Sequence, residues 1–394
     1  MQKYNIIHLP KEQWKNHILP MDYTSDFYYD VSIEKKEGAF LASFVKKPAQ
    51  PPISHTGEEY DFPDKLYQDF WEKAYAWGIL EEGKLVAAIE TCPEEWSNRL
   101  RVTELWVADG QRRMGMGHAL MSLAKEQARL ERRRAIILET QSCNSAAISF
   151  YLKEGFSLIG FDACCYANND LARREVRMEL GYIRNKPEKL PLSAVTIRPE
   201  TPADYMQTER MAQRAFWNKH RPGCDEHLLV HKLRTDSGYL PEISRVAEVD
   251  GKIAGCIMYS KSCLSNENGN HDIITFGPLC VDPDYAGMGI GEILVKETVK
   301  LATDAGYPGI VIFGEPDYYP RLGFKTCDHF GITTADGKNF DAFMGLELKK
   351  DALSAIGGRF HEAEVFETLT AEETENLNQN FPYLEKQQFP GQWD

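Results

Sequence analysis

The chain lacks the sequence features of membrane, secreted and nucleic-acid-binding proteins. No run of about eighteen apolar residues occurs, so we expect no membrane-spanning helix. The chain begins MQKYNIIHLPKEQW, without a basic segment followed by a long apolar one, so we expect no signal peptide. Acidic residues outnumber basic ones, 59 to 45, and the net charge of -14 disfavours binding to a phosphate backbone. These absences favour a soluble cytoplasmic protein without a nucleic-acid or membrane partner.

Patterns typical of metal sites and disulfide frameworks are also absent. The nine cysteines are odd in number and scattered, and no two have the Cys-x-x-Cys spacing of a zinc site. His227 and His231 are four residues apart, but no carboxylate motif accompanies them. We therefore expect reduced thiols and no bound metal.

The length and a change of composition predict two domains. A typical domain takes roughly 100–200 residues, and the chain has 394. A polar, proline-containing stretch, IRNKPEKLPLS, separates two parts in which a similar order of strands and helices recurs. We predict a first domain over residues 1–182, a linker over 183–194, a second domain over 195–350 and an acidic tail or appendage over 351–394. The sequence does not indicate the oligomeric state.

Hydrophobic periodicity and turn residues predict the elements of each domain. In the first domain we expect a β-hairpin over residues 30–47, a polar, proline-rich stretch over 48–63, a helix beginning at Asp64, strands over 75–89, 100–107 and 135–140, and helices after Gly117 and from Ala146. In the second we expect a hairpin over residues 245–259, strands over 273–281 and 309–313, and a helix over 291–305. The apolar stripe of the helix after Gly117 contains Leu120, Leu123, Ala124, Gln127 and Ala128.

Two glycine-rich turns each follow a predicted strand and open a predicted helix. The first contains Arg112, Arg113, Met114, Gly115, Met116 and Gly117. The second contains Gly287, Met288, Gly289, Ile290 and Gly291. Glycines allow a tight turn and a close approach of the backbone to a ligand, and free N–H groups at a helix start can hold a diphosphate. Because two copies lie about 170 residues apart in matching contexts, they indicate a duplicated phosphate-binding architecture rather than a chance connection.

Other phosphate-binding motifs do not fit these turns. A dinucleotide fingerprint needs a third glycine three residues after the second, where this chain has Leu120 and Glu292. A P-loop needs a Gly-Lys-Ser/Thr triplet, which is absent.

Arg112-x-x-Gly115-x-Gly117 and its second copy resemble the coenzyme A loop of the GNAT acetyltransferase superfamily. The resemblance extends to Asn144, Phe150-Tyr151 and Gly155-Phe156, and to the run from Tyr318 to Phe324 in the second domain; it covers most of residues 1–350. The first domain is similar to streptothricin acetyltransferases through residues 96–98, 138–141, 144, 150–151, 155–156 and 166–168. The second resembles a separate branch of predicted GNAT N-acetyltransferases through residues 277–279, the glycine turn and residues 318–324.

The resemblance implies a fold and a cofactor. The expected fold class is α/β, with two tandem domains that each contain a twisted mixed sheet flanked by helices. The expected cofactor is acetyl-coenzyme A, and the expected reaction is direct acetyl transfer to an amine in a ternary complex.

The resemblance also implies roles for single residues. Glu104 is the expected base, or else a carboxylate in a strand-end hydrogen-bond network. Tyr151 is the expected acid for the departing thiolate, or else packs against the pantetheine arm. Asn144 binds the cofactor, caps a helix, or does both. Backbone amides near Trp106 and Val107 polarise the thioester carbonyl.

The second domain departs from this pattern. Tyr319 matches Tyr151, and Leu279 and Val281 are expected to line the cofactor, but Pro278 stands where Glu104 would be and Ala286 where Arg112 would be. A different residue, such as Asp272, would have to supply a base.

We therefore predict a tandem N-acetyltransferase whose first domain acetylates a primary amine of a small cationic molecule, such as a streptothricin-like antibiotic. The alternatives are a protein or peptide amine as acceptor, and a non-catalytic coenzyme A-binding regulatory module. Three acidic residues, Glu58, Glu59 and Asp61, either meet a cationic substrate or form a solvated loop.

Overall fold

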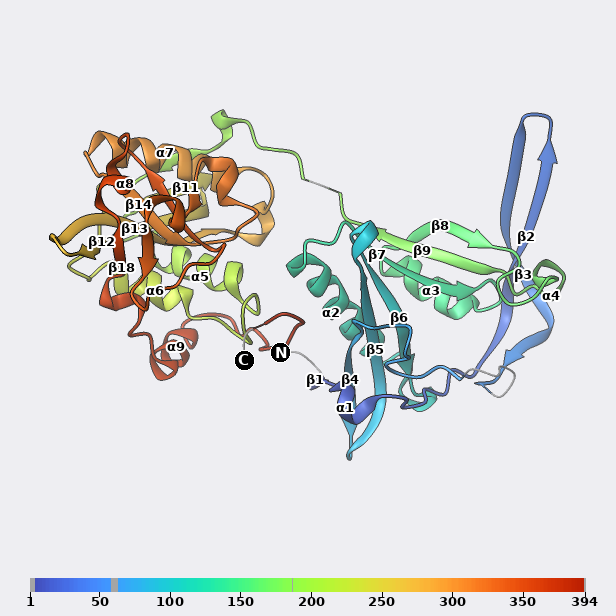
Figure 1. Ribbon diagram of the computed structural model, residues 1–394. Helices are drawn as coiled ribbons and strands as arrows, with labels where there is room; N and C mark the ends of the chain where they lie inside the picture. Colours follow the sequence, from blue (N-terminus) through green and yellow to red (C-terminus); the bar gives the residue numbers. More distant parts are fainter. Residues whose placement is uncertain (1–3, 58–62, 186, 393–394) are drawn as a thin grey trace. The chain divides into compact units, whose positions relative to one another are not determined.

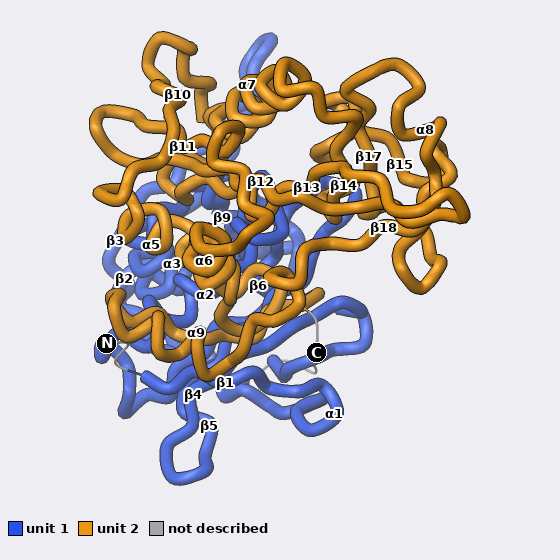
Figure 2. Tube along the Cα trace, turned by 90° about the vertical axis from the view of Figure 1, so that its left-hand side faces the viewer, with its two compact units in different colours: residues 1–186 blue, residues 187–394 orange. Residues whose placement is uncertain are grey.

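A computed structural model describes residues 4–57, 63–185 and 187–392. Glu58, Glu59 and Asp61 lie outside the described residues. The chain divides into two compact units, residues 1–186 and 187–394, coloured separately in Figure 2. Each unit contains a mixed sheet with helices packed against it, which confirms the α/β fold class predicted from the sequence.

The sheet of the first unit has the strand order β1-β4-β5-β6-β7-β9-β8. Neighbouring strands are antiparallel except β6 and β7, which are parallel. The bounds are β1 Ile6–His8, β4 Tyr75–Glu81, β5 Lys84–Glu94, β6 Arg99–Val107, β7 Ala135–Gln141, β8 Ser157–Asp162 and β9 Arg177–Ile183. The strands predicted over residues 75–89, 100–107 and 135–140 are confirmed.

A long two-stranded ribbon accompanies this sheet. Strands β2 (Tyr23–Lys36) and β3 (Ala39–His55) pair with each other, and their far end projects away from the rest of the first unit (Figure 1). The predicted hairpin is present but longer, because β3 runs through the proline-rich stretch to His55. Prolines lack an N–H donor and are tolerated on edge strands such as this one. The base of the ribbon packs through Tyr28 and Ala49 against Cys143.

The helix predicted from Asp64 is wrong. Residues 64–71 form turns, and Tyr67 has a positive φ of 57°, which interrupts a right-handed helix. The backbone here bonds to an earlier segment instead: Leu66 N–H donates to the carbonyl of His17 at 3.0 Å, and Leu19 N–H donates to that of Asp64 at 2.8 Å. This tertiary pairing overrides the local sequence preference.

The two longer helices of the first unit follow the prediction closely. Helix α2 (Met116–Leu130) packs against β5, β6 and β7, and every residue of the predicted apolar stripe is buried. Helix α3 (Ser145–Lys153) begins at the Asn144 cap and is followed by Gly155, whose φ of 89° suits a glycine. Two short helices, α1 (Lys11–Trp14) and α4 (Asp170–Arg173), complete the unit.

The second unit repeats this plan. Its sheet has the order β10-β11-β12-β13-β14-β17-β15, and β13 and β14 form the parallel pair. The bounds are β10 Thr196–Arg198, β11 Arg245–Val249, β12 Lys252–Asn266, β13 Gly269–Val281, β14 Gly309–Phe313, β15 Lys325–Thr326 and β17 Phe343–Glu347. Helix α7 (Ile290–Asp304) follows the second glycine turn, as α2 follows the first, and α5 (Tyr205–Phe216) and α6 (Glu226–Leu233) contact β12 and β13.

The C-terminal residues are built into the second unit. Strand β18 (Gly358–His361) pairs with β12 and with β16 (Ile332–Thr334), and α8 (Ala352–Ile356) packs against β17. Helix α9 (Ala371–Asn378) contacts α6, with Leu377 and Phe381 buried against Leu228. None of the helices in the described ranges is long and apolar enough to cross a membrane.

The predicted linker divides between the two units. Ile183 ends β9, and Arg184 donates from its guanidinium to the carbonyls of Ala128 and Arg133 in the first unit. From Pro187 onward the chain belongs to the second unit, where the Leu190 side chain packs against the core.

Candidate active site

The parallel strands at the centre of the first unit pair only at their beginnings. β6 and β7 share the register Arg99–Ala135 to Arg101–Ile137, and the rest of β6 has no partner on the β7 side among the described residues. Strand β7 continues against β9. The second unit shows the same separation, since β13 and β14 share the single register pair Ile274–Ile310. Backbone groups at the C-terminal end of β6 are therefore available to a ligand lying between the two strands.

The first glycine turn joins the end of β6 to α2. Arg113 and Gly115 both have positive φ, 65° and 99°, so the turn bends sharply before the helix. Among the described residues, the amides of Gly115, Met116 and Gly117 have no hydrogen-bond acceptor. A Cβ atom at Gly115 would meet only the Tyr4 side chain, at 3.8 Å, so the backbone is open on this side. Open amides at a helix start suit an anionic diphosphate.

The side chain of Arg112 is turned back onto the protein. Its guanidinium donates to the carbonyls of Val107 at 3.2 Å and Asp22 at 3.0 Å, and pairs with Asp109 at 2.9 Å. Arg112 therefore fixes the turn against the strand that precedes it, while backbone amides face outward.

Glu104 lies on β6 and is 7% exposed. Within the described ranges, its carboxylate accepts only a long hydrogen bond, 3.5 Å, from the Gln68 amide. Burial raises the pKa of Glu104 well above its ordinary value, and the charges of Asp64 and Glu90 raise it further. Glu90 itself is fully buried but satisfied, because Thr103 donates to it at 2.7 Å and the Tyr67 amide also donates. Burial also raises the pKa of Asp64 and of Glu90, so Glu104 belongs to a group of three carboxyl groups that all take up a proton more readily than usual.

Tyr151 lies on α3 close to Glu104. Its side chain is 8% exposed, and its hydroxyl has no hydrogen-bond partner in the described part of the chain. Burial raises the pKa of Tyr151, and the charge of Glu104 adds to that shift, which requires the two groups to be near each other. Because its pKa is raised, the Tyr151 hydroxyl keeps its proton at neutral pH. It can therefore donate a hydrogen bond to a reacting atom.

The other predicted residues of the first unit lie around this pair. The Asn144 side-chain oxygen accepts from the Ala147 amide at 3.1 Å, so Asn144 caps α3. Its NH₂ group has no hydrogen-bond partner in the part of the chain that the structure describes. Trp106 and Val107 end β6 next to the opening between the strands, and the Trp106 indole donates to the carbonyl of Pro20 at 2.8 Å.

The second unit has the turn but not the carboxylates. Gly287 and Gly289 have φ of 82° and 95°, and Tyr319 is 8% exposed with burial raising its pKa. In the first unit Leu105 pairs with Ile89, and in the second unit Leu279 pairs with Ile257. Glu104 and Pro278 each stand one residue before the paired leucine. Pro278 therefore occupies the strand position that Glu104 has in the first unit. By the same register, Met258 takes the place of Glu90.

Asp272 does not serve as a replacement base. It lies exposed opposite Cys263, seven residues before Leu279, which is about 23 Å along an extended strand. Leu279 and Val281 do lie at the end of β13, before the glycine turn.

Sequence reasoning missed the surroundings of Glu104. Gln68 and Glu90 come from segments distant in sequence, and their side chains carry no motif that signals the contact. The available signal was the position of Glu90 directly after the apolar run from Leu85 to Ile89. In the described residues, no group of three or more His, Cys, Asp or Glu side chains is arranged to hold a metal ion.

Substitution of Gly115 tests the turn. A β-branched residue at φ 99° is strained by roughly 1–2 kcal/mol and places side-chain atoms beside the open amides. We expect Gly115→Val to weaken binding of acetyl-coenzyme A at least tenfold, measured by calorimetry. Gly110→Ala is the matched control, because Gly110 lies in the same connection with no atom within 4 Å of an added Cβ. Unchanged affinity in folded Gly115→Val would refute the role of the turn.

Comparison with known proteins gives a match in each unit. Residues 45–156 match the family described as "Acetyltransferase (GNAT) family", and residues 241–326 match that described as "Acetyltransferase (GNAT) domain". The streptothricin acetyltransferase of Streptomyces lavendulae is 32% identical over 156 residues, which cover 34% of this chain and 80% of that protein.

A second relative is the uncharacterized N-acetyltransferase YhbS of Escherichia coli strain K12. It is 29% identical over 168 residues, covering 42% of this chain and 96% of YhbS. The crystal structure of YhbS from Escherichia coli in complex with CoA aligns with a TM-score of 0.40 at 27% identity, covering 47% of this chain and 98% of that one.

Proposed function

Because this chain belongs to the acetyltransferase (GNAT) family, we propose that its first unit transfers an acetyl group from acetyl-coenzyme A to a primary amine of a small cationic molecule. The observation that carries the proposal is the end of β6, which has no partner on the β7 side among the described residues and leads into a glycine turn with open amides, together with the buried Glu104 on β6 and Tyr151 on α3, which are near enough for the charge of Glu104 to raise the pKa of Tyr151.

The residues of the first unit fit acetyl-coenzyme A. The open amides of Gly115, Met116 and Gly117 would hold its diphosphate, and the end of β6 at Trp106 and Val107, which has no partner on the β7 side among the described residues, would face the thioester carbonyl. When bound, acetyl-coenzyme A supplies the acetyl group and departs as the thiol. The NH₂ group of Asn144 would donate to it, since the cap uses the side-chain oxygen and no acceptor among the described residues takes the NH₂ group.

Glu104 makes the amine reactive. An alkyl ammonium has a pKa of about 10.4, so its neutral form costs about 4.6 kcal/mol at pH 7. A carboxylate with a raised pKa accepts the ammonium proton more readily than an ordinary one, directly or through a water molecule. Tyr151 donates its proton to the leaving sulfur and regains one from the nitrogen as the amide forms. The ammonium therefore loses two protons, of which one leaves through Glu104 to solvent and the other balances the proton that the thiol gains.

A cationic acceptor suits the electrostatics around Glu104. Asp64 and Glu90 contribute negative charge at this position, and their repulsion of the Glu104 carboxylate is relieved when a cation binds between them. Streptothricin is the first candidate, because a relative at 32% identity bears the name streptothricin acetyltransferase.

An amine screen tests the substrate class. The full chain is incubated with acetyl-coenzyme A and streptothricin, polyamines or peptides, and acetylated products are detected by mass spectrometry. Acetylation of a small cationic amine is expected. Preferential acetylation of peptides would favour the protein-amine alternative, and cofactor binding without turnover on any amine would favour a regulatory module.

The working unit is tested by a pair of variants of the full chain, assayed on the amine that the screen identifies. We expect Glu104→Gln combined with Tyr151→Phe to abolish most of the activity, and Tyr319→Phe to retain it, because Pro278 offers no ionisable group beside Tyr319. If the double variant keeps full activity while Tyr319→Phe loses it, the assignment to the first unit is wrong.

A further inference from the structure

Residues 187–192, here called the linker segment, lie against the glycine turn of the second unit. Leu190 N–H donates to the carbonyl of Met288 at 3.0 Å. The ring of Pro187 lies 2.9 Å from where a Cβ at Gly287 would be, and the stem of Lys189 lies 3.7 Å from a Cβ at Gly289. Both glycines are thus in close contact with a segment that precedes the first strand of the unit.

The linker segment leaves the amides of this turn open. The carbonyl of Met288 and the N–H of Gly289 belong to one trans peptide, so they point in opposite directions. Leu190 bonds to the carbonyl and therefore lies on the far side from that N–H. Among the described residues, the amides of Gly289, Ile290 and Gly291 have no acceptor. The contact fixes the turn while its anion-binding side stays accessible.

The first unit contains an equivalent contact to its glycine turn, made by a side chain instead of a backbone amide. The Tyr4 hydroxyl donates to the carbonyl of Met114, in the peptide that carries the Gly115 N–H. Gly115 and Gly289 have almost the same conformation, with φ and ψ of 99° and 0° and of 95° and -2°. A segment upstream of the first strand thus holds the equivalent carbonyl in each unit.

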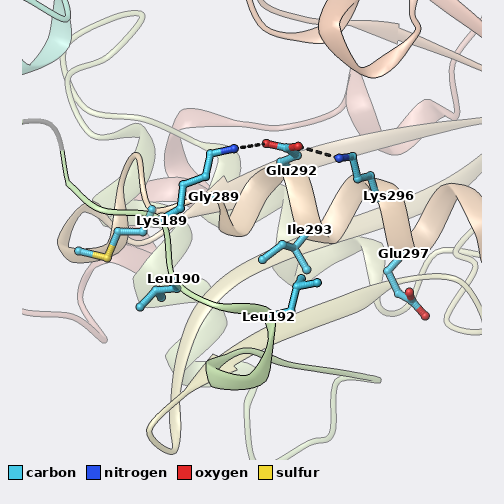
Figure 3. Close-up of a pocket in the computed structure, with 9 residues that line it drawn as sticks. Lys189, Leu190, Leu192, Gly289, Glu292, Ile293, Lys296 and Glu297 are labelled. Atoms are coloured by element: carbon cyan, nitrogen blue, oxygen red, sulfur yellow. Dashed lines mark hydrogen bonds and ion pairs between the residues drawn. The ribbon is translucent and has the colours of Figure 1, made fainter.

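A cleft of about 420 Å³ lies between the linker segment and α7, beside this turn (Figure 3). Its volume lies within the range of small-molecule sites, about 300–1,000 Å³. Aliphatic carbons of Leu190, Leu192 and Ile293 line it, and Lys189 and Lys296 stand at its rim. The Glu292 carboxylate lies 3.0 Å from the ammonium of Lys189 and 2.7 Å from that of Lys296. These two contacts lower the pKa of Glu292 to about 2.

From this arrangement we infer that the linker segment is part of the cofactor site of the second unit, where it fixes the glycine turn and, with α7, forms a cleft that takes the nucleoside end of coenzyme A. The inference rests on the proposed cofactor, and it concerns a unit to which the proposed transfer is not assigned. A diphosphate on the amides of Gly289–Gly291 lies next to Met288 and Gly289, which line the same cleft.

The cleft has the chemistry of a nucleoside site. Leucine and isoleucine side chains pack against the faces of a purine, while the charged rim meets ribose hydroxyls. Lys189 and Lys296 are 69% and 66% exposed, and each ammonium has three donors, of which Glu292 takes one. Both lysines therefore retain donors for the phosphate on the ribose of coenzyme A.

The test measures binding of coenzyme A, dephospho-coenzyme A and 4′-phosphopantetheine to the full chain by native mass spectrometry and calorimetry. The Gly115→Val chain isolates the second site. There, Leu192→Asp is expected to weaken coenzyme A at least tenfold and to leave 4′-phosphopantetheine unchanged. Leu192 is 72% exposed, so this substitution spares the core. If Leu192→Asp leaves the affinity for coenzyme A unchanged, or weakens coenzyme A and 4′-phosphopantetheine equally, the inference is overturned.

Two matched pairs separate the contributions of the linker segment and α7. Lys296→Ala should weaken coenzyme A more than dephospho-coenzyme A, whereas Lys300→Ala, exposed on the same helix outside the cleft, should change neither. Leu190→Pro removes the N–H donor and should weaken all three ligands, while Leu190→Ala keeps it and should have the smaller effect. A Gly115→Val chain that binds no coenzyme A refutes the inference even if wild-type protein acetylates amines, so the two proposals fail separately.

Discussion

Glu104→Gln is expected to lower the turnover number by roughly 10²–10⁴-fold, the usual contribution of a general base. The amide keeps the shape of the carboxylate but cannot take up the ammonium proton. Affinity for acetyl-coenzyme A should stay the same, because the cofactor is held by backbone amides of the glycine turn. Steady-state kinetics on the acetylated amine and calorimetry on the cofactor measure the two quantities, with Glu82→Gln in an exposed turn as the control.

The pH dependence gives this prediction a second readout. Burial raises the pKa of Glu104, so wild-type activity should fall on acidification through a pH well above the ordinary glutamate value of about 4.3. The Gln variant should lack that limb. Asp64, Glu90, Gln68 and Tyr151 surround the group, and the two carboxylates keep its pKa high. An acid limb that persists unchanged in Glu104→Gln would mean that Glu104 belongs to a structural network.

The folding stability of wild type and of Glu104→Gln should also depend on pH in different ways. A carboxyl group whose pKa is higher in the folded chain than in the unfolded chain stabilises the fold at low pH, and this contribution is lost as the pH rises through the folded pKa. Glutamine does not ionise. The melting temperature of Glu104→Gln relative to wild type should therefore rise as the pH is raised above the ordinary glutamate pKa of about 4.3 and through the raised pKa of Glu104.

Tyr151→Phe is expected to reduce turnover by roughly 10²–10⁴-fold if its hydroxyl supplies the leaving-group proton. Phenylalanine fills the same space between Phe150 and Phe156, so folding and cofactor affinity should be nearly unchanged. The measurement is single-turnover kinetics, where chemistry limits the rate. Tyr182→Phe is the control, because Tyr182 touches Phe156 but lies on β9. Wild-type turnover in Tyr151→Phe would leave the residue a packing role.

The parts of the fold that the sequence predicts well are those set by local patterns. The glycine turns are visible because positive φ at Gly115, Gly287 and Gly289 demands residues that tolerate it, and α2 because its buried stripe repeats at helical spacing. Asn144 is placed correctly at the start of α3. The roles of Glu104 and Tyr151 stay predictions until the variants are measured.

The parts that sequence reasoning misses depend on long-range contacts. Asp64 to Trp71 has helical composition, yet its backbone bonds to residues 16–19. The contact of Gln68 with Glu104 joins two segments 36 residues apart. The linker has the composition of a polar connection, and its hydrogen bond to Met288 spans 98 positions, with no local pattern that marks it.

The β2–β3 ribbon has a consequence for the behaviour of the protein at high concentration. Residues 32–43 are exposed on both strands, including Phe40 at 79% and Leu41 at 47%, so two open backbone edges and apolar side chains face water. Such edges invite pairing with another chain. Two lysine pairs, at 35–36 and 46–47, oppose that pairing by repulsion, and prolines at 48, 51 and 52 oppose it by offering no donor. Added salt screens the repulsion between the lysines but does not change the prolines. We therefore expect self-association to begin at the tip of the ribbon as the ionic strength rises.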